Sequence, residues 1–86
     1  MKVIMKPIEV IASFSLEGKP TPIKFKTNDQ NGSITVRVDR IVDRSDEKIA
    51  GNPMLLFLCE SCIDDVQKRY EIKYEVATCK WYLSKT

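Results

Sequence analysis

The chain has 86 residues, the size of one small domain, so we expect residues 1–86 to form a single fold with a thin hydrophobic core. Its 43 % hydrophobic and 30 % charged residues exclude a disordered chain. Fourteen Lys and Arg against twelve Asp and Glu give a net charge of +2, which is too small for a dedicated nucleic-acid binder. The basic excess lies in residues 1–44, so any anion-binding surface is expected there.

The cysteines and the N-terminal residues indicate a cytoplasmic protein without a membrane anchor. Three cysteines, an odd number, fit reduced thiols better than a disulfide framework. Lys6 and Pro7 interrupt the apolar N-terminal run, which argues against a secretory signal. No stretch approaches the roughly 18 apolar residues that a membrane span needs.

Residues 68–76 carry the clearest secondary-structure pattern. Side chains on a strand alternate between its two faces, and here apolar side chains occupy every second position, at Tyr70, Ile72, Tyr74 and Val76. We therefore expect these four side chains to share the buried face of a β-strand. Similar patterns and their turn residues predict five further strands, near residues 7–14, 21–27, 33–43, 53–62 and 79–84.

Two local signals add detail to this pattern. Ile41 comes one residue late after Val38, which predicts a β-bulge near residues 39–40 within one long strand. Ser45 is a typical helix cap, two acidic residues follow it, and Gly51 suits a helix end, so one short helical turn is predicted near residues 45–50. The expected fold is all-β, a six-stranded antiparallel meander that closes into a small SH3-like or OB-like barrel.

The run Met54–Leu58 is apolar at every position and leaves two interpretations open. It fits a central strand that the domain itself covers on both faces. It also fits a strand whose second face is covered by another protein or by a second copy of the chain. The second interpretation predicts a homodimer or a protein–protein interaction, through this strand or through a sheet edge.

No motif in the chain predicts catalysis. Ser45 and Lys48 match the S-x-x-K spacing of some hydrolases, but the same residues fit a helix cap and the companion motifs are missing. Asp64 and Asp65 fit a solvated turn, and the chain has neither a His nor a glycine-rich phosphate loop. We therefore expect a binding module that is not an enzyme and has no cofactor.

Cys59 and Cys62 form a C-x-x-C motif, which occurs in zinc sites and redox pairs. Those sites need both sulfur atoms on one side, whereas an extended strand points these two positions to opposite faces. Only Cys79 remains as a further thiol, and the chain has no His. We expect structural cysteines and no metal, with a metal site of these three residues as the alternative.

The most usable functional signal is a basic face. Lys24, Lys26 and Arg37 are expected to point outward from the second and third strands, and Lys80 and Tyr82 from the last strand. If all five share one surface, they combine positive charge with an aromatic ring, as in small barrels that bind single-stranded nucleic acid. The alternative is a solvated surface of mixed charge.

Several short motifs lie near the two ends of the chain. They are Pro7-Ile8-Glu9-Val10, Gly18-Lys19-Pro20, Ile23-Lys24-Phe25, Tyr70-Glu71-Ile72 and Trp81-Tyr82-Leu83. In these motifs the chain resembles a family of small uncharacterised bacterial proteins, classed as a domain of unknown function. Some members of similar families are encoded beside DNA-repair polymerase genes, so the resemblance implies a nucleic-acid context. It implies no catalytic or binding residue.

The sequence therefore supports three functional hypotheses. The first is weak nucleic-acid binding through the basic face, and the second is protein interaction or self-association. The third is metal binding by Cys59, Cys62 and Cys79.

Overall fold

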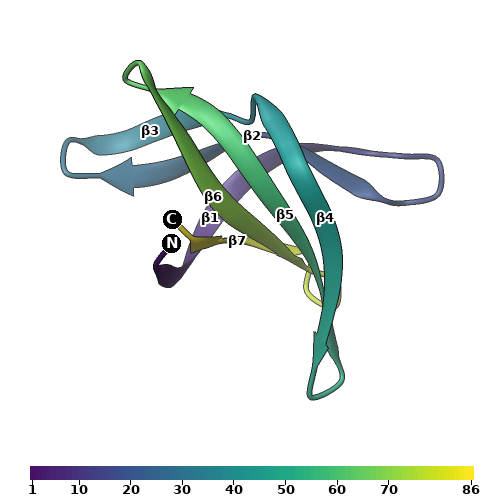
Figure 1. Ribbon diagram of the computed structural model, residues 1–86. Helices are drawn as coiled ribbons and strands as arrows, with labels where there is room; N and C mark the ends of the chain where they lie inside the picture. Colours follow the sequence, from purple (N-terminus) through teal and green to yellow (C-terminus); the bar gives the residue numbers. More distant parts are fainter.

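The computed structural model describes residues 1–86, apart from the side chain of Asp29. The protein is all-β, as predicted, and its seven strands form one antiparallel sheet in the order β3-β2-β1-β7-β6-β5-β4 (Figure 1). They are β1 (Val3–Phe14), β2 (Pro20–Asp29), β3 (Gly32–Arg37), β4 (Arg40–Ile49), β5 (Asn52–Ile63), β6 (Val66–Glu75) and β7 (Lys80–Lys85). The described backbone contains no helix long and apolar enough to cross a membrane.

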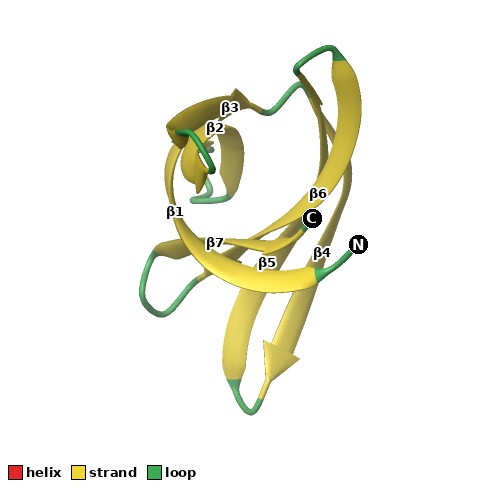
Figure 2. Cartoon of the chain, turned by 90° about the vertical axis from the view of Figure 1, so that its left-hand side faces the viewer, coloured by secondary structure: helices red, strands yellow, loops and turns green.

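Strand β1 joins the two halves of the sheet and curves strongly between them (Figure 2). Its first half pairs with β7, where Pro7 lies opposite Tyr82 and Ile8 lies opposite Trp81. Its second half pairs with β2, beginning at Glu9. Strands that pass from one sheet segment to another form the corners of bent sheets.

The predicted strand over residues 33–43 is two strands, so the expected number of six strands is wrong. The chain leaves β3 at Val38, whose N–H donates to the carbonyl oxygen of Ile23 in β2 at 2.8 Å. The next N–H, of Asp39, donates to the carbonyl oxygen of Glu60 in β5 at 3.1 Å. Two residues thus carry the chain from one end of the sheet to the other. The register shift lies further on, between Ile41 and Asp43.

The predicted helical turn near residues 45–50 is also wrong, because this segment continues β4. Ser45 lies opposite Leu56, and Glu47 lies opposite Met54. Ala50 and Gly51 then form a tight turn with positive φ values of 51° and 81°. A helix cap contributes only about 1 kcal/mol, whereas pairing with β5 satisfies the backbone along the whole segment.

The sheet does not close into the predicted barrel, and β3 and β4 remain as its two edge strands. Parts of the opening between β3 and β4 are bridged by hydrogen bonds from side chains, because no strand ladder forms there. The Ser61 hydroxyl donates to the carbonyl oxygen of Arg37 at 2.6 Å, and the Arg44 guanidinium donates to the Thr21 hydroxyl at 3.1 Å. Residues 38–39 connect β3 to β4 across this opening, and the two strands do not pair with each other.

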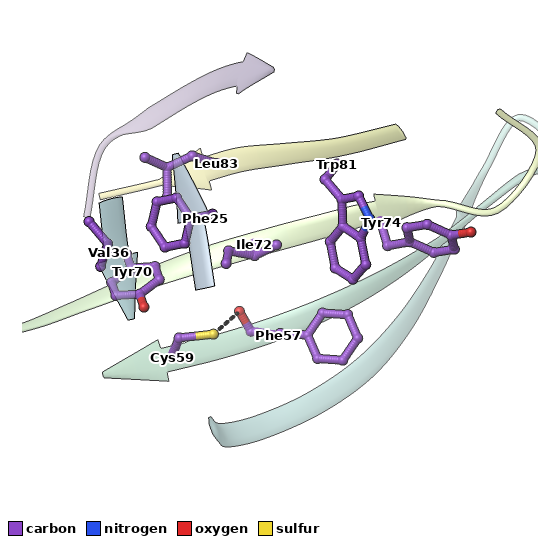
Figure 3. Packing of buried hydrophobic residues seen from close by; sticks show 9 residues of the cluster. All are labelled: Phe25, Val36, Phe57, Cys59, Tyr70, Ile72, Tyr74, Trp81 and Leu83. Carbon is purple, nitrogen blue, oxygen red and sulfur yellow. Dashed lines mark hydrogen bonds between the residues drawn. The ribbon is translucent and has the colours of Figure 1, made fainter. Parts of the chain in front are cut away.

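The hydrophobic core lies inside the curved sheet (Figure 3). It consists of Phe25, Val36, Phe57, Cys59, Tyr70, Ile72, Tyr74, Trp81 and Leu83. The expected inward face of β6 is therefore confirmed for its two tyrosines and for Ile72. Val76 differs, because β6 ends at Glu75 and Val76 lies exposed in the following turn. The rings of Tyr74 and Trp81, with centroids 4.6 Å apart, close one end of the core.

Candidate nucleic-acid interface

Two basic side chains face each other across β2 and β3. Lys24 lies directly opposite Arg37, and Lys26 lies two residues further along β2. Between these positions Phe25 and Val36 are directly opposite each other and buried in the core. Alternation along both strands therefore points Lys24, Lys26 and Arg37 outward, where all three are exposed.

These three cations form no ion pair with any side chain that the structure describes. The ion pairs found lie elsewhere, for example between Lys73 and Glu47 at 3.0 Å. Like charges directly opposite each other on neighbouring strands destabilise a sheet. The basic cluster of Lys24, Lys26 and Arg37 is therefore a concentration of positive charge without an ion pair among the described side chains.

Glu9 is the acidic residue next to this cluster. It lies opposite Lys26 on β1 and is exposed. It lines a shallow hollow of about 270 Å³ together with Ile11, Lys24 and Lys26. It also lines a second hollow of about 470 Å³ with Lys26. Sequence reasoning missed Glu9, because its position beside Lys26 depends on the pairing of β1 with β2.

Lys80 and Tyr82 occupy β7, on the other side of β1. Lys80 is exposed, whereas Tyr82 is half-buried between its cross-strand neighbours Pro7 and Lys73. Glu9 lines a further hollow with both residues. The five predicted site residues thus form two groups, with β1 and Glu9 between them.

Glu75 interacts with Lys80 and Tyr82, the two predicted site residues on β7. Its carboxylate accepts hydrogen bonds from the Thr78 hydroxyl at 2.5 Å and from the Asn52 amide at 2.8 Å. These bonds, with the charge of Lys80 and a hydrogen bond from Tyr82, hold the pKa of Glu75 below its usual range. The charge of Lys80 is therefore partly compensated, whereas the basic cluster on β2 and β3 has no ion pair among the described side chains.

Two exposed aliphatic residues accompany the basic cluster. Ile11 lies directly opposite Lys24 and is 57 % exposed. Alternation with the buried Phe25 along β2 predicts that Ile23 points inward, but the register shift between Ile11 and Ala12 makes it the extra residue on β2. Its side chain is 43 % exposed. A bulge re-aims side chains in this way. The cluster therefore has apolar surface beside its charges.

The three cysteines are not brought together. Cys59 is buried and its thiol donates to the carbonyl oxygen of Phe57 at 3.6 Å. Cys62 is exposed near the end of β5, and Cys79 is exposed in the turn before β7. Among the described residues, no group of three or more His, Cys, Asp or Glu could hold a metal ion.

The apolar run Met54–Leu58 places its side chains on both faces of β5. Phe57 is in the core, whereas Leu56 and Leu58 are partly exposed on the outer face. Leu56 lies next to Lys73, and Leu58 lies next to Glu71. No strand of the described chain forms a second layer over these two leucines.

Comparisons of the chain with protein-family models, with curated proteins and with solved structures found no match.

Proposed function

We propose that the protein is a non-catalytic cytoplasmic module that binds single-stranded nucleic acid on the outer face of β2 and β3. Lys24, Lys26 and Arg37 bind the phosphate groups, and Lys80 and Tyr82 extend the surface across β1. The proposed site uses the backbone charge of the ligand, so its sequence preference is weak.

The observation that carries this proposal is the direct opposition of Lys24 and Arg37. Two like charges at this position cost stability, and no described acidic side chain pairs with either of them. A bound polyanion supplies the missing negative charge and removes the repulsion. The partner is therefore expected to carry several negative charges at close spacing, as a phosphate backbone does.

The shape of the surface favours a single strand over a duplex. The hollows beside Lys24 and Lys26 are shallow and lie between neighbouring strands, and the described chain has no helix that could enter a groove of a duplex. A flexible single strand can follow such a surface and place bases on exposed aliphatic side chains such as Ile11. Three cations predict modest affinity that falls steeply with added salt.

The test compares two variants of equal net charge in binding to a labelled oligothymidylate of about 20 nucleotides. The site variant carries Lys24→Gln, Lys26→Gln and Arg37→Gln. The control variant carries Lys19→Gln, Lys48→Gln and Lys68→Gln, at exposed positions outside the basic cluster. Fluorescence anisotropy is recorded at about 50 mM and about 200 mM salt.

We expect the wild-type affinity to fall about twentyfold between the two salt concentrations, because three neutralised phosphates give a slope of about −2 for single strands. The site variant should lose most of its low-salt affinity, and the control variant should lose little. Equal losses in both variants would assign binding to net charge alone. Absence of binding at low salt would disprove the proposal.

A second proposal, self-association through the outer face of β5, rests on Leu56 and Leu58. Both leucines are partly exposed without a covering layer of the described chain. Sedimentation of the wild type and of Leu58→Lys tests it. A dimer that the substitution dissociates supports the proposal, and a monomer at high concentration contradicts it.

A further inference from the structure

We propose that the groove between β3 and the end of β5 binds an extended peptide segment of another protein, which adds to β3 as a further strand. We call it the seam groove, and its volume is about 550 Å³. Its walls include Ile34, Val36 and Arg37 from β3, and Cys62, Ile63 and Asp64 from the end of β5 and its turn. This inference shares Arg37 with the proposed nucleic-acid site, but neither its argument nor its test requires oligonucleotide binding.

The groove exists because β3 and β5 meet at one end only. At the closed end, the Ser61 hydroxyl donates to the carbonyl oxygen of Arg37 at 2.6 Å. Beside it, the N–H of Cys62 donates to the carboxylate of Asp39 at 2.8 Å. From there β5 continues to the turn at Asp64, while β3 runs back toward Gly32.

The backbone of β3 determines which kind of ligand fits. Strand β3 pairs with β2 along one edge, and no strand covers its other edge. An uncovered edge presents a row of N–H and C=O groups at the spacing of an extended chain. Ile34 and Ile63, both partly buried, supply apolar contact for side chains at alternate positions of such a chain. This combination is typical of strand addition, in which backbone bonds give affinity and small pockets give selectivity.

The other edge strand lacks these properties. Six of the ten residues of β4 are charged, whereas Arg37 is the single charged residue among the six of β3. Charged side chains are a common protection of sheet edges against added strands. Arg44 of β4 also reaches across to the hydroxyl of Thr21. The open edge available for a partner is therefore that of β3.

The charges that line the seam groove, and the space beside it, narrow down which segment can bind there. Arg37 lies at the closed end of the groove and Asp64 at its mouth, so the segment should carry an acidic residue at one end and a basic residue at the other. A second copy of this chain fits poorly, because the free edge of its own β3 faces its own β5 end. Two copies would bring two such walls into the same space.

The probe is a capped synthetic peptide, Glu-Val-Thr-Val-Thr-Lys, designed to run antiparallel to β3 with its glutamate at Arg37. Binding is measured through the maleimide reactivity of the wild-type thiols, because Cys62 lines the groove. Cys79 is an exposed thiol outside it and serves as an internal control, while Cys59 is buried. A second peptide with N-methyl groups at alternate residues cannot form the backbone ladder.

We expect modification of Cys62 to slow about tenfold at a peptide concentration of about ten times the Kd, with no change at Cys79. Amide hydrogen exchange of β3 should slow in parallel, and the N-methylated peptide should have neither effect. The substitution Ile63→Arg should abolish protection. Val66→Arg, at the exposed position paired with Ile63 but outside the groove, should retain it.

Three results would overturn the proposal. They are no protection of Cys62 at millimolar peptide, equal protection by the two peptides, and protection that rises with protein concentration in the absence of peptide. The last result would assign the groove to a second copy of the chain.

Discussion

The hydroxyl oxygens of Tyr70 and Ser61 lie 2.5 Å apart inside the sheet, and the Ser61 oxygen lies 2.6 Å from the carbonyl oxygen of Arg37. A carbonyl oxygen can only accept, so Ser61 donates to Arg37 and Tyr70 donates to Ser61. Two hydrogen bonds in series thus connect β6, β5 and β3. They hold the end of β3 against β5 where no strand pairing does so.

This arrangement predicts different costs for removing the two hydroxyl groups. Tyr70→Phe removes one hydrogen bond and leaves Ser61 paired with Arg37, so it should lower the free energy of unfolding by about 1 kcal/mol. Ser61→Ala removes both bonds and leaves the buried Tyr70 hydroxyl without a partner, which should cost about 2 to 3 kcal/mol. Urea unfolding measures both values. A cost for Tyr70→Phe equal to or above that for Ser61→Ala would contradict this hydrogen-bond direction.

We expect the stability of the protein above pH 9 to depend on Cys59. Its side chain is fully buried, and burial raises the pKa of its thiol to about 12 from the ordinary value of 9.0. At pH 7 and below, the thiol is protonated in both the folded and the unfolded state and has no effect on the pH dependence. Between pH 9 and 12 the unfolded state loses the proton first, so stability falls by about 1.4 kcal/mol per pH unit from this group.

The variant Cys59→Ala should therefore lose stability less steeply between pH 9 and 12 than the wild type. Burial also raises the pKa of Tyr70, but that residue is present in both proteins and cancels in the comparison. Urea unfolding at several pH values gives the two slopes. If the slopes are the same, Cys59 does not titrate differently in the folded and unfolded states.

Glu9 opposes the proposed ligand, because it lies opposite Lys26 and lines the hollows on both sides of β1. Removing its charge with Glu9→Gln should raise oligonucleotide affinity at low salt about fivefold, since two unit charges about 4 Å apart in water interact by about 1 kcal/mol. Glu17→Gln is the control, at an exposed position in the β1–β2 turn. An equal gain in both variants would show that net charge alone sets affinity.

Local sequence patterns correctly predicted those strands and strand faces that depend only on residues close together in the chain. The inward direction of Tyr70 and Ile72 follows from alternation along one strand, as does the outward direction of Lys24 and Lys26. The opposition of Lys24 and Arg37 depends in addition on the turn at residues 30–31, which sets the register of β2 and β3.

Features that depend on distant partners were not predictable in this way. The break after β3 exists because Val38 and Asp39 bond to Ile23 and Glu60, which are far apart in the sequence. The capping pattern at Ser45 is a real local signal, but pairing of β4 with the apolar β5 overrides it. The open edge of β3, and with it the seam groove, follows from this long-range arrangement.

The most direct test of the proposed nucleic-acid site measures stability and affinity on the single variant Arg37→Glu. Replacing the like charge opposite Lys24 by an opposite one should raise the free energy of unfolding by about 0.2 to 1 kcal/mol. The same change should lower oligonucleotide affinity at low salt about tenfold or more. The matched control is Arg40→Glu, which breaks the ion pair with Glu60 and should lose stability while retaining affinity. An Arg37→Glu protein that keeps its affinity for the oligonucleotide would contradict the account, whatever its stability.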